Sequence, residues 1–230
     1  MATALITGAS RGIGRELAAR LAERGWHVIA GCRDPERAGL PEGIETHRLD
    51  TADHASIDAL AAKLRGTPID LLINNAGSYG PQGFPDGQHY QTFGTTDYDI
   101  WADVMRVNLF GPMKMVEAFA DHLAASERKL VVNMSSDLGS IANNAHGGSH
   151  AYRTSKAALN MLTKGLSVDL ASRGITVVSL APGWTRTELG GSMAHLSVEE
   201  SVAGQSAVIE RLQAKDSGRV VTLRGADVDW

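Results

Sequence analysis

The amino-acid sequence predicts an α/β protein, a doubly wound parallel sheet of about seven strands flanked by helices on both faces. Short apolar runs rich in β-branched residues alternate with amphipathic helical stretches from end to end. This alternation is typical of parallel sheets built from βαβ units. In addition, the glycine-rich stretch TGASRGIG at 7–14 joins the first apolar run to the first helical stretch, where such sheets often bind a phosphate-bearing ligand.

Seven segments have the composition of strands. They are residues 2–7, 27–31, 44–49, 69–74, 129–134, 175–180 and 219–223. Between them, apolar residues recur at helical spacing over 13–24, 55–64, 97–125 and 152–172. Pro112 is expected to disturb the third of these helices, because proline lacks the amide that the helical ladder needs.

Two segments interrupt the alternation. Residues 78–96 and 138–150 are dense in glycine and polar residues, and loops of this length in a compact domain usually serve function. With the region after Thr187 they are expected to form the substrate pocket. We find no internal repeat, low-complexity tract or linker, so residues 1–230 are predicted to form a single domain.

Composition excludes several classes of partner. The net charge of −4 at pH 7 gives no reason to expect nucleic acid or an anionic membrane surface. The N-terminus, MATALITG, lacks the basic start and apolar run of a secretory signal, so we expect a cytoplasmic protein. The only cysteine, Cys32, permits neither an internal disulfide nor a cysteine-based zinc site; we expect a buried structural thiol and no metal.

The glycine turn predicts an anion site. Gly8, Gly12 and Gly14 allow a tight turn and close approach of a ligand, and the helix that follows offers free amides to a phosphate. A purely structural tight turn is the alternative. Arg11 lies in the turn and Arg33 follows the second strand, where a guanidinium would bind a 2′-phosphate; this favours NADP over NAD. Otherwise the two arginines are simply solvated.

Residues at the ends of the third and fourth strands extend this site. Asn75, Ala76 and Gly77 offer exposed backbone to a cofactor's ribose. Asp50 could accept a hydrogen bond from an adenine amino group, or it could instead cap the helix that begins near Asp53.

Tyr152 and Lys156 lie four residues apart on a predicted helix, and therefore on one face. An ammonium there can lower the pKa of the phenol, which would then exchange a proton with a carbonyl oxygen during hydride transfer. Ser135 and Ser136 end the fifth strand, from which a hydroxyl can reach the same oxygen. After the sixth strand, Thr185 and Thr187 could bind a carboxamide or phosphates.

Together these residues name a family. The motifs TGASRGIG, NNAG at 74–77, Asn108, NMSS at 133–136, YRTSK at 152–156 and PGWTRT at 182–187, in this order, resemble the short-chain dehydrogenase/reductase family. The strings YRTSKAALNMLTKGLSVDL and SLAPGWTRTELGG are similar to its subgroup that includes the sniffer carbonyl reductases and the C-factor signalling protein. The C-terminal GRVVTLRGADVDW departs from the subgroup's pattern.

The resemblance implies a Rossmann-type fold, hydride transfer between NADP(H) and a ketone, aldehyde or alcohol, and a homo-oligomer, dimer or tetramer, paired through the two long helices. It implies that Tyr152 is the general acid/base, Lys156 binds the nicotinamide ribose, Ser136 polarises the substrate oxygen and Asn108 holds a relay water; whether Ser135 or Ser136 serves stays open. The full set expected to bind cofactor is Gly8, Ser10, Arg11, Gly12, Ile13, Gly14, Arg33, Asp50, Thr51, Asn75, Ala76, Gly77, Tyr152, Lys156, Pro182, Gly183, Thr185 and Thr187. The alternative function is a nucleotide-binding signalling or regulatory protein on a dehydrogenase scaffold.

Overall fold

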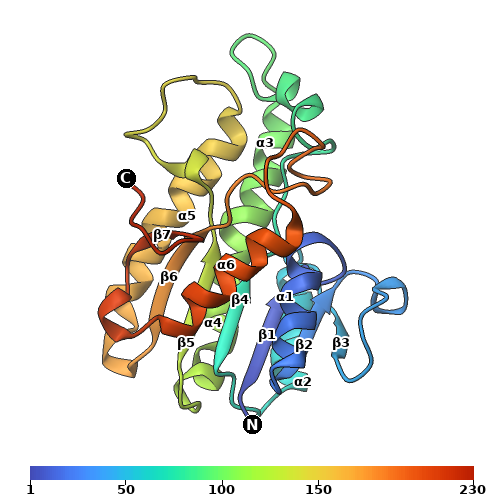
Figure 1. The fold of residues 1–230 in the computed structure, drawn as a ribbon, viewed down its shortest axis with the longest axis vertical. Coiled ribbons are helices and arrows are strands. Elements are labelled where there is room, and N and C mark those ends of the chain that lie inside the picture. Colours follow the sequence, from blue (N-terminus) through green and yellow to red (C-terminus); the bar gives the residue numbers. More distant parts are fainter.

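The strands form one parallel sheet, as predicted. The computed structural model covers residues 1–230, and its strand order is β3-β2-β1-β4-β5-β6-β7 (Figure 1). The strands are β1 (Thr3–Thr7), β2 (His27–Cys32), β3 (Glu45–Arg48), β4 (Leu71–Asn74), β5 (Leu130–Met134), β6 (Thr176–Ala181) and β7 (Val220–Thr222). Each begins and ends within two residues of its predicted bounds. The central strands are buried on both faces and read as continuous apolar runs, whereas β3 is a partly exposed edge strand.

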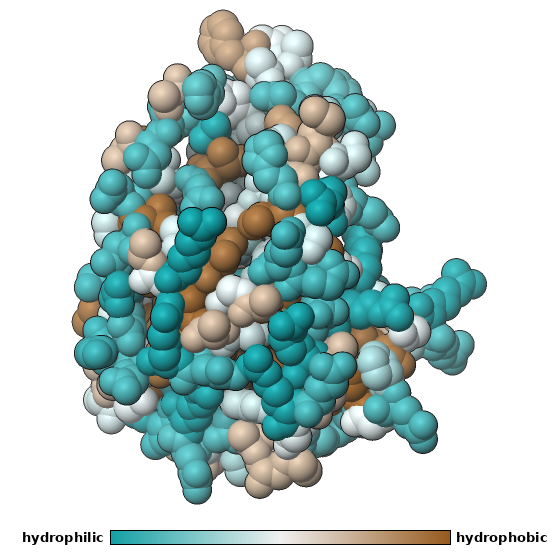
Figure 2. Space-filling model, viewed as in Figure 1, coloured by the Kyte–Doolittle hydropathy of each residue, from teal (hydrophilic) through white to brown (hydrophobic).

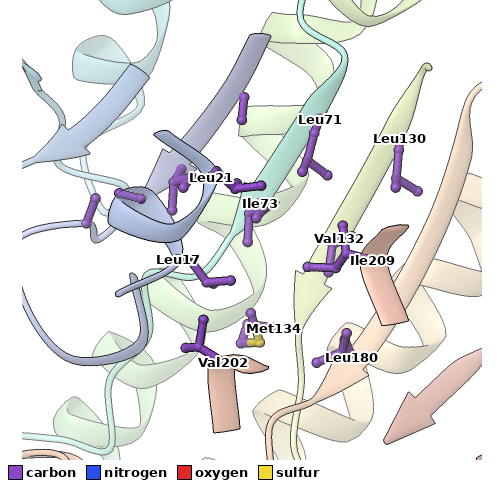
Figure 3. Close-up of a cluster of buried hydrophobic side chains, with 14 of the residues drawn as sticks. Leu17, Leu21, Leu71, Ile73, Leu130, Val132, Met134, Leu180, Val202 and Ile209 are labelled. Atoms are coloured by element: carbon purple, nitrogen blue, oxygen red, sulfur yellow. The ribbon is translucent and has the colours of Figure 1, made fainter. Parts of the chain in front are cut away.

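Helices cover both faces of the sheet. They are α1 (Gly12–Glu23), α2 (His54–Lys63), α3 (Tyr98–Met105), α4 (Gly111–Ala124), α5 (His150–Asp169) and α6 (Val198–Arg211). Helices α1 and α6 bury Leu17 and Val202 against one face, where Figure 3 shows them beside strand residues such as Ile73 and Val132. Helices α2, α4 and α5 pack on the other face around Phe119.

The predicted long helix over 97–125 is divided. Asp97 caps α3, and a five-residue π-helical segment, Arg106–Phe110, separates α3 from α4. Pro112 lies in the first turn of α4, where a missing amide costs little. The disturbance therefore falls just before the proline, as a widened turn that contains Asn108.

Helix α6 is absent from the sequence prediction. It begins with a capping box, in which Ser197 accepts from the amide of Glu200 while the Glu200 carboxylate accepts from the amide of Ser197. The pattern Ser-x-x-Glu is a sequence signal for a helix start. Small and polar residues, among them Gly204 within the helix, obscure its narrow apolar stripe.

Because the strands are parallel, their carboxyl ends all lie at one edge of the sheet. The three loops expected to form the pocket gather beyond that edge, at the top of Figure 1, while the N-terminus lies at the opposite end. On the face that bears α1 and α6 the surface is mostly hydrophilic, with scattered apolar residues (Figure 2). No helix combines the length and apolar composition needed to cross a membrane.

Candidate active site

A cavity of about 1150 Å³ opens at the carboxyl edge of the sheet. The glycine turn, the ends of five strands, the first turns of α5 and the three loops line it. Every residue expected to bind cofactor lies on its wall, as do Ser136, Tyr152 and Lys156. Asn108 is the exception, since its side chain is fully buried behind the wall.

The glycines of the turn are required by neighbouring protein atoms. A Cβ on Gly14 would lie 2.4 Å from both the Asn75 amide nitrogen and the Gly8 carbonyl oxygen, and one on Gly8 would lie 2.9 Å from Ala76 Cα. Asn75 Nδ2 donates to the carbonyls of Thr7 (3.0 Å) and Gly8 (3.2 Å). The glycines thus let the end of β4 lock onto the turn, which sets the shape of the anion site.

The amides at the start of α1 have the donor set that a phosphate needs. The amides of Gly12, Ile13 and Gly14 donate no hydrogen bond to a backbone or side-chain acceptor, and no acidic residue lies in the first turn. The cap residue Arg11 provides no capping bond either. Three free amides at the positive end of a helix, on the wall of a cavity, fit the pyrophosphate of a dinucleotide.

The two arginines differ in their surroundings. The guanidinium of Arg33 is exposed and pairs with no carboxylate, although Asp34 follows it, because Asp34 pairs with Arg37 at 3.4 Å. Arg11 instead forms an ion pair with Glu188, across the mouth of the cavity. Sequence reasoning missed Glu188, which lies 177 residues away from Arg11 in the chain.

Asp50 does not cap the second helix. Its Oδ1 accepts from the amide of Ala52 at 3.0 Å, while Asp53 caps α2 by accepting from the amide of Ala55. Asp50 and the nearly buried Thr51 both line the cavity beside Arg33. This end of the cavity therefore has one carboxylate, from Asp50, and one guanidinium, from Arg33.

Tyr152 and Lys156 lie together at the base of the cavity. The Lys156 ammonium is 5.5 Å from the centroid of the Tyr152 ring and donates to the carbonyl of Met134 at 2.8 Å. Burial raises the pKa of Tyr152 to about 12, opposed by the neighbouring Ser136 hydroxyl, and burial lowers the pKa of Lys156 to about 8. The pKa of the phenol is therefore raised, in contrast to the lowering expected from the sequence, because burial of Tyr152 is its main cause.

The two serines that end β5 have separate surroundings. The Ser135 hydroxyl is buried and donates to Asn160 Oδ1 at 2.6 Å. The Ser136 hydroxyl accepts from the amide of Leu138 at 3.2 Å, lines the cavity beside Tyr152, and lowers the pKa of the Tyr152 phenol. Only Ser136 is thus directed at the group that would exchange the proton.

The buried Asn108 side chain joins two segments beneath the cavity by hydrogen bonds. Its Oδ1 accepts from the amide of Ser78 and its Nδ2 donates to the carbonyl of Ser78, both at 2.8 Å. The same Nδ2 donates to the Ser155 hydroxyl at 2.9 Å. Both N–H groups of the side chain are therefore used in joining the residue after the NNAG motif to α5, while Oδ1, with one bond, can accept one more.

The threonines after β6 bond within their own loop. Thr185 Oγ1 donates to the carbonyl of Gly183 at 3.1 Å, and Thr187 Oγ1 accepts from the amide of Gly190 at 3.0 Å. They line the cavity, as predicted, but their hydroxyls also shape the turn. The expected carboxamide or phosphate contact would compete with these bonds.

Four aromatic side chains form a connected row along the cavity. The rings of Tyr79 and Tyr152 are 5.1 Å apart, Tyr79 contacts Phe84 edge to face, and Phe84 contacts Trp184 at 5.7 Å. The amide of Phe84 also donates to the carbonyl of Leu189 at 2.9 Å, which joins two loops into one roof. Sequence reasoning placed Tyr79 and Phe84 in the pocket region without assigning contacts, and missed Trp184.

Comparison with known proteins agrees with this geometry. A family model described as short chain dehydrogenase matches residues 2–197. The C-signal protein of Myxococcus xanthus is 37% identical over 172 residues, which are 75% of this chain and 99% of that protein. Carbonyl reductase Sniffer of D. melanogaster superposes with a TM-score of 0.90 at 32% identity over 100% of both chains. An NADPH-bound carbonyl reductase from chicken fatty liver gives a TM-score of 0.87 at 32% identity over 99% of this chain and 98% of that one.

Proposed function

The chain belongs to the short-chain dehydrogenase/reductase family, and on that premise we propose that it is an NADPH-dependent carbonyl reductase acting on a ketone or aldehyde, or on the alcohol in reverse. The observation that carries the proposal is one cavity that joins three free helix amides at one end to the Ser136, Tyr152 and Lys156 side chains at the other. A pure binding module has no physical need for the second set.

The proposed cofactor residues divide by chemistry. The amides of Gly12, Ile13 and Gly14 would hold the pyrophosphate, and Arg33, unpaired at the adenine end, would bind the 2′-phosphate. Lys156 would hold the nicotinamide ribose. NADPH in the chicken carbonyl reductase structure is consistent with this cofactor. When bound, the nicotinamide supplies the hydride for the carbonyl carbon.

The proton steps belong to the chain. Tyr152, neutral far above pH 7 because burial raises its pKa to about 12, would donate its proton to the oxygen as negative charge develops there. Ser136 would hold that oxygen by a hydrogen bond, and the Lys156 ammonium would stabilise the phenolate that remains. In the oxidative direction the same phenol would act as base.

The test is cofactor titration followed by a turnover assay with a panel of ketones and aldehydes. Tyr152→Phe is expected to bind NADPH within about two-fold of the unchanged protein and to lose at least about 1000-fold in kcat. Tyr98→Phe removes the hydroxyl of an exposed tyrosine that does not line the cavity, and it is the matched control. Full turnover by the Tyr152→Phe protein, or no binding of either cofactor, would overturn the proposal.

A second candidate function is nucleotide-dependent signalling, which the 37% identity to C-signal favours. In that case the Tyr152→Phe protein would keep its biological activity, whereas a bulky residue at Gly14 would abolish it. The complete proton-transfer set argues for the enzyme.

We also propose a cytoplasmic homo-oligomer that pairs through the long helices α4 and α5. Met161 and Val168 of α5 expose 68% and 66% of their surface, and because they lie two helical turns apart they share one face of the helix. Met161→Lys would then reduce the mass measured by light scattering, and an unchanged mass would contradict pairing at α5.

A further inference from the structure

The first turn of α5, which carries Tyr152, has an unusual cap. Ser149 precedes the helix in a left-handed conformation (φ 49°, ψ 38°) and makes no side-chain capping bond. Its hydroxyl is bonded to the phenol of Tyr79 instead. The amides of the first turn must therefore find acceptors elsewhere, since a buried, unpaired amide is costly.

A single residue of the 78–96 loop supplies them. The Gln91 carbonyl accepts from the amide of His150 at 2.9 Å, and its Oε1 accepts from the amide of Tyr152 at 2.8 Å. Its Nε2 donates to the carbonyl of Tyr79 at 2.6 Å and, at 3.3 Å, to that of Gly87. Gln91 is completely buried and does not line the cavity.

These bonds close a circuit around the phenol. One end of the Gln91 amide holds the backbone of Tyr152 and the other end holds the backbone of Tyr79. The two tyrosine rings meet 5.1 Å apart, and the Tyr79 hydroxyl returns to Ser149 at the helix start. The Tyr152 ring is positioned by its own backbone and by that of Tyr79, whose ring it contacts. The Gln91 side chain bonds to both backbones.

We propose that Gln91 is a positioning residue for proton transfer, whose amide clamps Tyr152 to Tyr79 and so holds the phenol at the reacting oxygen. The proposal rests on the proposed role of Tyr152. A displacement of about 1 Å in a reacting group can cost about 100-fold in rate. The clamp also joins the glycine-rich 78–96 loop to the first turn of α5.

The donor and the acceptor that the clamp requires distinguish a positioning role for Gln91 from a purely structural one. The clamp needs one acceptor, for Tyr152, and one donor, for Tyr79. A protonated glutamic acid has both and nearly the same shape, whereas an ionised carboxylate would face two carbonyls without a donor. Gln91→Glu should therefore restore the clamp only below the pKa of the new carboxyl, and Gln91→Leu should not restore it at any pH.

The experiment compares kcat, measured per NADPH-binding site, for both variants between pH 5.5 and pH 8. We expect Gln91→Leu to lose about 10- to 100-fold in kcat with the Kd for NADPH within about two-fold. Gln91→Glu should approach the unchanged protein at the acid end and fall relative to it as pH rises, so that the ratio of the two kcat values shows a step.

Gln205→Leu is the matched control. Gln205 is also completely buried, bonds to Ser201 in α6, and lies off the cavity wall. Gln205→Leu should lower the free energy of unfolding without the 10- to 100-fold loss of kcat expected for Gln91→Leu. If folded Gln91→Leu keeps full kcat, or if Gln91→Glu loses kcat equally at every pH, the positioning role is wrong. Should Gln91→Leu fail to fold, the pH step of Gln91→Glu decides. Turnover by Tyr152→Phe would instead refute the proposed function itself.

Discussion

The Lys156 ammonium lies 5.5 Å from the centroid of the Tyr152 ring, and both side chains are nearly buried. Burial acts on them in opposite senses, lowering the pKa of Lys156 to about 8 and raising that of Tyr152 to about 12. The protein therefore carries a proton donor that stays neutral and a cation that is held charged against a desolvation cost. That cost makes the free energy of unfolding depend on pH.

The first prediction concerns this dependence. Below about pH 8 Lys156 is protonated in both states. Between pH 8 and its ordinary value of 10.5 the unfolded chain binds more protons, so stability rises with pH, by about 2 kcal/mol between pH 8 and pH 10. Above pH 10 the unfolded phenol ionises while folded Tyr152 stays neutral to about 12, so stability falls again.

Urea unfolding at pH 7.5 to 9.5 without cofactor checks this, with Lys156→Met expected to remove the rise. Lys164→Met changes an exposed lysine on the same helix and should preserve it. If the free energy of unfolding varied with pH in the same way for the unchanged protein and for Lys156→Met, burial of the Lys156 ammonium would carry no desolvation cost.

A second prediction separates the serines that end β5. Ser136→Ala removes a donor to the reacting oxygen and should lower kcat by about 100-fold with little effect on stability. Ser135→Ala leaves buried Asn160 Oδ1 without its partner and should cost about 1–3 kcal/mol in stability with a smaller effect on kcat. Steady-state kinetics beside thermal unfolding measures both; the opposite pattern would assign the oxygen contact to Ser135.

Arg33 carries the third prediction. Replacing it with serine removes charge-assisted bonds to a 2′-phosphate, worth about 1.5–3 kcal/mol, so the Kd for NADPH should rise about 10- to 100-fold while that for NADH stays unchanged. Arg37→Ser is the matched control, because Arg37 is 89% exposed in its side chain and pairs only with Asp34. Equal weakening of both cofactors by Arg33→Ser would contradict a phosphate-specific role.

The sequence predicted the strands and the motifs, but not the contacts that close the site. Buried parallel strands and the Tyr152 to Lys156 spacing are local signals, readable from a few consecutive residues. The clamp by Gln91 and the ion pair from Arg11 to Glu188 join segments that only the fold brings together. Helix α6 was not predicted, because Gly204 and several polar residues obscure the helical spacing of its apolar residues, although its capping box could be recognised in the sequence.

The last prediction tests why the glycine turn lacks side chains. Gly14 and Gly165 both lie within helices, α1 and α5, without positive φ. A Cβ on Gly14 would lie 2.4 Å from Asn75 Nδ2 and from the Gly8 carbonyl, whereas one on Gly165 would meet nothing within 4 Å. Gly14→Ala should therefore push Asn75 off the turn, weaken NADPH binding and lower stability.

Gly165→Ala, by contrast, should raise stability by up to about 1 kcal/mol through helix propensity alone. Calorimetric Kd values and unfolding midpoints for the two proteins give the comparison. If Gly14→Ala bound NADPH as well as Gly165→Ala does, the contact between the glycine turn and Asn75 would not shape the phosphate site. The glycines would then be required only by the close approach of the ligand.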